Sequence, residues 1–166
     1  MLGDLPQWDL SDLYASINDS KLSSDKIEIE ELTEIFINKY QNKIATLSSE
    51  KLNEAIRDYQ TINQKLGKLY SYVSLTFSIN TDKPDFGKKY QEIRELGSII
   101  FSKLVFFELE IMNLDDNTSK KYLSDNHLSL WKPWLRKIFQ RKPFQLSNDL
   151  EQFIAEKGPS GRGAWV

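Results

Sequence analysis

The chain has 166 residues, of which 40% are hydrophobic and 12% aromatic, and this composition favours a single globular domain over a disordered chain. A formal net charge of -2 gives no strong overall field, so we expect no nucleic-acid partner. The absence of cysteine excludes disulfides and thiolate chemistry. The most apolar stretch, residues 99–107, is too short to span a bilayer, and the first residues lack the pattern of a secretion signal. We therefore expect no membrane partner and a cytoplasmic location.

Apolar residues recur every three or four positions along most of the chain, which predicts helices. Residues 1–22 are expected to form a lead-in segment with a short helical turn at 11–14. Long helices follow at about 24–44, with Ser24 as N-cap, at 48–78, and at 84–111, with Pro84 in the first turn. The later half of the third helix is apolar nearly all round, so it is predicted to be the most buried element.

Shorter helices are predicted in the remainder of the chain. They are expected at about 119–123, at 128–140 with Pro133 in the first turn, and from an N-cap at Ser147 to residue 157. The sequence thus predicts a helical lobe at 23–157 and a loop at 158–166. The expected fold is all-α, with long antiparallel helical hairpins in an elongated bundle and shorter C-terminal helices.

A search for reactive groups finds no complete catalytic site. The zinc motif H-E-x-x-H needs two histidines one helical turn apart, whereas this chain has only His127. No second base is present to build a triad around a serine, and no Glu-x-x-His pair suits a di-metal centre. We therefore predict no catalytic, cofactor-binding or metal-binding residue here, and we interpret His127, close to Asp125, as a surface or capping residue.

Three further features have a structural and a functional interpretation. Glu108 and Glu110 lie in an apolar run and are expected to be structural, although an acid–base role or a partner contact is the alternative. The glycine-rich loop at 158–163 lacks the spacing of a phosphate-binding loop. A cluster of cations surrounds Trp131 and Trp134, which would suit single-stranded nucleic acid, but an amphipathic helix with a solvated basic face is the simpler interpretation. The cations are Lys132, Arg136, Lys137, Arg141 and Lys142.

Four phrases in order resemble the amino-terminal region of oligoendopeptidase F-type zinc metallopeptidases, which are relatives of thimet oligopeptidase. They are Trp8-Asp-Leu-Ser-Asp12-Leu-Tyr14, Gly67-Lys-Leu-Tyr-Ser-Tyr72, Phe106-Phe-Glu-Leu-Glu110 and Ala155-Glu-Lys-Gly-Pro-Ser-Gly-Arg162-Gly-Ala-Trp165. The order and the spacing of the four phrases also fit this family. The resemblance covers nearly the whole chain, from Leu5 to Val166.

The resemblance implies a helical lobe that covers the cleft of a peptidase and restricts entry to short unfolded peptides. It also implies that zinc and the catalytic residues lie in a carboxy-terminal half that this chain lacks, so the chain alone is expected to be inactive. The implied partners are that catalytic domain, in cis, and oligopeptide substrates. Trp8, Trp165, Val166 and parts of the third helix are the expected open surfaces. The alternative is a non-enzymatic helical module that binds another protein.

Overall fold

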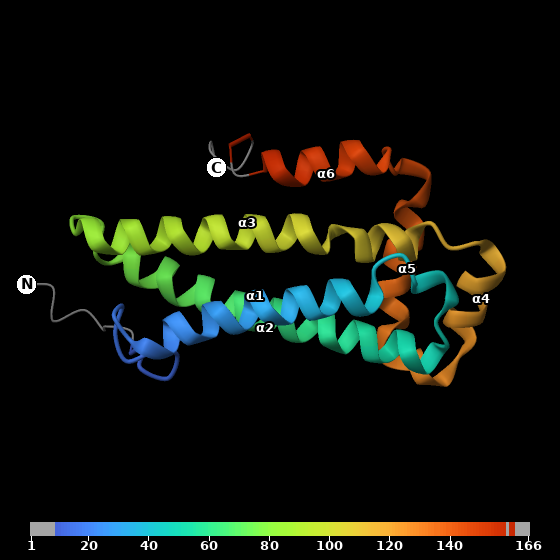
Figure 1. Ribbon diagram of the computed structural model, residues 1–166, viewed down its shortest axis with the longest axis horizontal. Coiled ribbons are helices and arrows are strands. Elements are labelled where there is room, and N and C mark those ends of the chain that lie inside the picture. Colours follow the sequence, from blue (N-terminus) through green and yellow to red (C-terminus); the bar gives the residue numbers. More distant parts are fainter. Residues whose placement is uncertain (1–8, 159, 162–166) are drawn as a thin grey trace, which may run out of the picture.

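The computed structural model describes residues 9–158, 160 and 161, and within that part of the chain every regular element is helical (Figure 1). The prediction of an all-α fold is confirmed. In chain order the elements are α1 (Ser20–Tyr40), η1 (Ile44–Thr46), α2 (Ser49–Ser78), α3 (Pro84–Met112), α4 (Asp116–Ser124), η2 (Asn126–Trp131), α5 (Lys132–Arg141), η3 (Lys142–Phe144) and α6 (Asn148–Lys157). None of these helices has the length and hydropathy required to cross a membrane.

The three long helices α1, α2 and α3 run side by side and contact one another (Figure 1). Helix α5 crosses one end of this group, and α6 runs along α3 on the side away from α1 and α2. The α6 helix contacts α3, and α5 contacts both α3 and α4. The chain therefore returns along α3 after it has turned around the end of the long helices.

Helix α1 begins earlier than the sequence suggested. The Asp19 carboxylate accepts a hydrogen bond of 2.9 Å from the backbone N–H of Lys21, so Asp19 rather than Ser24 is the N-cap. Ser24 lies inside the helix, where its hydroxyl donates to the carbonyl of Lys21 at 3.0 Å. The predicted turn ahead of this helix is present, because the N–H of Tyr14 donates to the Leu10 carbonyl at 3.3 Å.

The C-terminal end of α1 also differs from the prediction, which extended the helix to Ile44. The helix ends at Tyr40, and Asn42 has a φ of 61°, a left-handed conformation that asparagine tolerates better than most residues. Glu110 of α3 stabilises this turn, since its carboxylate accepts from the N–H groups of Asn42 at 2.7 Å and Ile44 at 3.3 Å. A contact with a distant helix thus ends α1, and local spacing could not reveal it.

The remaining helix ends follow the sequence, with two exceptions. Ser48 caps α2 as expected, and Pro84 stands in the first turn of α3. Helix α4 begins at Asp116 rather than near 119, because the Asp115 side chain caps it. The single helix expected at 128–140 is two elements, η2 and α5, since Pro133 has no N–H with which to continue an α-helix from the preceding turn.

An aromatic cluster forms the centre of the core. Phe107 of α3 is fully buried, and its ring centroid lies 5.1 Å from Phe36, 5.0 Å from Tyr59 and 6.3 Å from Trp134. These rings come from α1, α2, α3 and α5, so one side chain connects four helices. Aromatic pairs at such distances contribute beyond their buried area.

Two polar contacts join the α4–α5 segment to the start of α2 and to the turn just before it. The Tyr122 hydroxyl donates to the Leu47 carbonyl at 2.8 Å, and the Trp131 indole N–H donates to Asn53 at 2.7 Å. Tyr122 is buried and Trp131 is half-buried. Trp131 and Trp134 are therefore occupied by the fold, as the amphipathic interpretation of this segment predicted.

The later half of helix α3, which we predicted to be the most buried element, is open along one side. Ile99 and Phe101 expose 55% and 56% of their surface, respectively. Helix α6, which runs beside them, exposes Leu150, Phe153 and Ile154 to a similar degree. The described part of the chain therefore carries an open apolar surface on α3 and α6, of a kind that marks an interaction site.

Lys26 of α1 and Lys89 of α3 both bond to Glu92 at 2.8 Å, and these contacts lower its pKa from 4.5 to about 2. A carboxyl group whose pKa is lower in the folded state than in the unfolded state stabilises the fold at pH values above its unfolded-state pKa. The contribution of Glu92 should therefore be present above pH 4.5 and lost as the pH falls through 2. Glu92 is partly exposed, so we expect about 0.5 kcal/mol. Urea unfolding of the native chain and of Glu92→Gln should differ at pH 7 and converge near pH 2; a constant difference would contradict the assignment.

Candidate functional site

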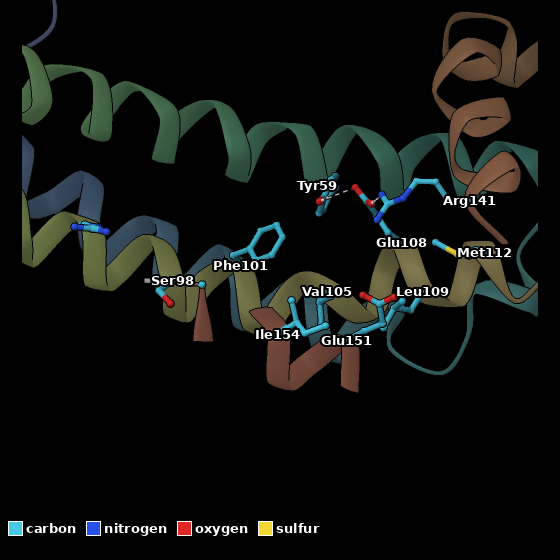
Figure 2. A pocket seen from close by; sticks show the side chains of 12 residues that line it. Tyr59, Ser98, Phe101, Val105, Glu108, Leu109, Met112, Arg141, Glu151 and Ile154 are labelled. Carbon is cyan, nitrogen blue, oxygen red and sulfur yellow. Dashed lines mark hydrogen bonds and ion pairs between the residues drawn. The ribbon is translucent and has the colours of Figure 1, made fainter. Parts of the chain in front are cut away.

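A groove of about 530 Å³ runs along one face of α3 (Figure 2). Ser98, Phe101, Val105, Glu108 and Met112 line it from α3, at spacings of three and four that place them on one helix face. The opposite walls come from other elements, with Tyr59 from α2, Arg141 from α5 and Glu151 and Ile154 from α6. The groove therefore exists only because α5 and α6 turn back onto α3.

The middle of the groove is apolar and open. Phe101 points from α3 towards Tyr59 of α2 (Figure 2). Ile154 of α6 is 52% exposed, and Val105 of α3 is half-buried. A concave site with apolar walls and a few polar groups is typical of ligand binding.

One end of the groove is charged. The Glu108 carboxylate accepts from the Tyr59 hydroxyl at 3.4 Å and from the Arg141 guanidinium at 3.4 Å, contacts that Figure 2 draws as dashed lines. Both distances are long for charge-assisted hydrogen bonds, and the Arg141 side chain is 58% exposed, so the ion pair contributes little to stability. Burial and the neighbouring Glu108 charge raise the pKa of Tyr59 to about 12, so its hydroxyl remains a donor at neutral pH.

The two glutamates of the apolar run have different surroundings. Glu110 accepts from backbone N–H groups in the turn after α1 and is structural, as predicted. Glu108 instead faces the groove. The groove itself could not be predicted from the sequence, because Tyr59 did not stand out from the helical pattern and Arg141 stood out only as one of a cluster of cations. The one available signal was Phe101, an apolar residue on a helix that already had enough other apolar residues to form its core face.

Apart from Arg141 of the cationic cluster, which lines the groove, the other candidates of the sequence lie away from it. Asp125 accepts from the backbone N–H of His127 at 2.9 Å and contacts its ring, and the ring is largely exposed, which agrees with a capping and surface role. Within the cationic cluster, Lys132 and Lys142 bond to backbone carbonyls, whereas Arg136 and Lys137 are exposed. The solvated basic face is therefore observed.

The described residues do not fit a zinc site, because no group of three His, Cys, Asp or Glu side chains among them is placed to hold a metal ion. Trp8, Trp165 and Val166, which we expected to be open, lie outside the described residues, as does most of the loop at 158–166. What remains is a set of side chains able to bind and orient a ligand. In the described part, the chain is an all-helical fold with an open groove along α3.

Comparison with known proteins shows what this chain is similar to. A family model for the amino-terminal part of M3 peptidases, described as Oligopeptidase F, matches residues 110–166. An oligoendopeptidase F homolog of Borreliella burgdorferi is 26% identical over 92% of this chain and 25% of its own length. The homolog of Mycoplasma genitalium is 27% identical over 92% and 24%, and oligopeptidase PepF of Bacillus subtilis is 23% identical over 90% and 22%. No solved structure matches significantly.

The resemblance predicted from the four phrases is therefore confirmed: the chain is similar to oligoendopeptidase F peptidases. It spans about a quarter of the length of these curated relatives. The matched residues of the family model include α5 and α6, which supply Arg141, Glu151 and Ile154 to the groove.

Proposed function

We propose that this chain is the amino-terminal helical lobe of an oligopeptide-cleaving zinc metalloendopeptidase, and that the lobe covers the cleft and admits short unfolded peptides. The observation that carries the proposal is the open apolar surface on α3 and α6, in a chain that spans a quarter of its relatives. In this proposal the remaining part of the peptidase supplies the zinc and the catalytic groups. The residues described here bind and orient, and they exclude bulky substrates.

The exposed apolar residues fall into two groups, according to whether they line the groove. Ile99, Leu150 and Phe153 are exposed but do not line the groove, so we assign them to contact with the catalytic part. Phe101 and Ile154 are exposed and line the groove, so we assign them to the substrate path. The three long helices that contact one another behind the groove provide a stiff wall for such a path.

The proposal is tested by separate production of this chain and of the remainder of the polypeptide encoded with it. We expect neither part to cleave peptides efficiently alone, and we expect the two together to do so. Ile99→Glu should weaken their association at least tenfold, because a charge would be buried in an apolar contact. Ile35→Glu is the matched control, since Ile35 of α1 is 59% exposed and lies on another helix.

The size restriction is measured on the reconstituted enzyme. Phe101→Ala should raise cleavage of a folded protein relative to a short unstructured peptide that carries the same cleavage sequence. A remainder that cleaves both substrates at the same rates with and without this chain would overturn the lobe function. It would favour the alternative, a helical module that binds another protein.

A further inference from the structure

The outward face of α5 continues into the short helices on both sides of it. The backbone is right-handed helical at Trp131 and Lys132, where η2 meets α5, and at Arg141 and Lys142, where α5 meets η3. One helical path therefore spans residues 126–144. Exposed residues recur along it every three or four positions, which places them on one face, called here the α5 stripe. They are Leu130, Pro133, Lys137, Gln140 and Phe144.

The α5 stripe has an apolar side chain at each end and cannot turn inwards. On the opposite face of α5, Leu135 and Ile138 are buried in the core, which fixes the orientation of the helix. Phe144 and Leu130 are 83% and 76% exposed, more than any other large apolar side chain in the described part of the chain. Their exposure therefore follows from the fold, and it requires an explanation.

The middle of the α5 stripe is positively charged. Residues 126–148 contain five cations and no carboxylate. Three of these cations bond to other residues, as described above. Arg136 and Lys137 are exposed and have no partner among the described residues. Two unpaired cations thus lie between two exposed apolar side chains.

This order of groups separates the possible partners. A protein interface has apolar groups at its centre and charges at its rim, which is the reverse of the α5 stripe. Single-stranded nucleic acid stacks on exposed aromatic rings, whereas Trp131 and Trp134 are occupied by contacts within the fold. A helix on an anionic bilayer uses both features, because its cations approach the phosphate groups and its apolar side chains enter the boundary of the acyl chains.

We propose that the α5 stripe binds the surface of an anionic lipid bilayer, with Arg136 and Lys137 at the phosphate groups and with Leu130 and Phe144 inserted. The two apolar residues are 14 positions apart, about 21 Å at 1.5 Å per residue, so they enter the bilayer at two separate points. The inference departs from the expectation of no membrane partner, which concerned spanning segments and secretion signals. It goes beyond the proposed function and uses neither the groove nor α6.

The test is co-sedimentation of the 166-residue chain with lipid vesicles. Vesicles of phosphatidylcholine alone are compared with vesicles of equal parts of phosphatidylcholine and phosphatidylglycerol. We expect binding to the anionic vesicles only, with an affinity that falls as salt is raised.

Two double variants separate the charged from the apolar contribution. Arg136→Gln/Lys137→Gln should weaken binding about 25-fold, since each cation near an anionic surface contributes about fivefold. Leu130→Ser/Phe144→Ser should weaken it about tenfold, because two apolar side chains no longer enter the bilayer.

Each double variant has a matched control. Arg57→Gln/Lys88→Gln removes an exposed arginine and an exposed lysine from α2 and α3. Ile79→Ser removes an apolar side chain that is 71% exposed at the end of α2. Both controls should bind the anionic vesicles as the native chain does, and circular dichroism would verify that all variants remain folded.

Three results would overturn the inference. The first is equal binding, or no binding, to both kinds of vesicle. The second is full binding by the Leu130→Ser/Phe144→Ser variant, since the contact would then be electrostatic alone. The third is tighter binding of a short single-stranded oligonucleotide than of the anionic vesicles, which would assign the stripe to nucleic acid. The proposed function would stand in each case, because it depends on α3 and α6.

Discussion

Replacement of Phe107 with alanine should lower the free energy of unfolding by about 4 kcal/mol, because it would leave a cavity at the point where four helices meet. Phe107 is fully buried and packs against Phe36, Tyr59 and Trp134. The neighbouring helices cannot collapse into the space without moving relative to one another. Urea unfolding followed by tryptophan fluorescence and by circular dichroism would measure the loss.

Phe101→Ala is the control for this variant. It removes the same side chain from the same helix, but Phe101 is 56% exposed and faces the groove. We expect a loss of about 0.5 kcal/mol, as for substitutions outside the core. Similar losses in the two variants would mean that the groove side of α3 is packed as tightly as its core side, which would contradict the open surface.

The contrast between these two phenylalanines also marks the limit of prediction from the sequence. The spacing of apolar residues predicted α2 and α3 well, since a stripe at three and four positions has one structural interpretation. The same spacing cannot say which side of an all-round apolar helix finds a partner. That depends on how many other helices the chain supplies, and here α6 covers its side of α3 without burying it.

The first three phrases that carry the family resemblance contain residues that pack the fold. Tyr14 of the first phrase contacts Tyr72 of the second, with ring centroids 5.0 Å apart, and its hydroxyl donates to Asp25 at 2.8 Å. In the third phrase, Phe107 holds the core together and Glu110 fixes a turn. Glu108 and Leu109 of that phrase line the groove. A search for reactive residues could not have found a site of this kind, because the groove forms only where α5 and α6, from the C-terminal part of the chain, pack against α3.

The second large effect is expected at Glu110. Glu110→Ala should lower the free energy of unfolding by about 2 kcal/mol, because two backbone N–H groups would lose a charged acceptor. Those groups belong to Asn42 and Ile44, in the turn where Asn42 has a positive φ. Chemical denaturation at neutral pH would measure the change, and amide hydrogen exchange should be faster at these two residues than in the native chain.

Glu108→Ala provides the comparison, since it removes the same group two positions earlier on α3. Its contacts are long and partly exposed, so the loss should stay at about 0.5 kcal/mol. An equal loss at both positions would show that the Glu108 contacts with Tyr59 and Arg141 stabilise the fold as much as the Glu110 contacts do. The Glu108 carboxylate would then not be open to a ligand. A large loss at Glu110 alone would separate the turn that ends α1 from the carboxylate that remains available for binding.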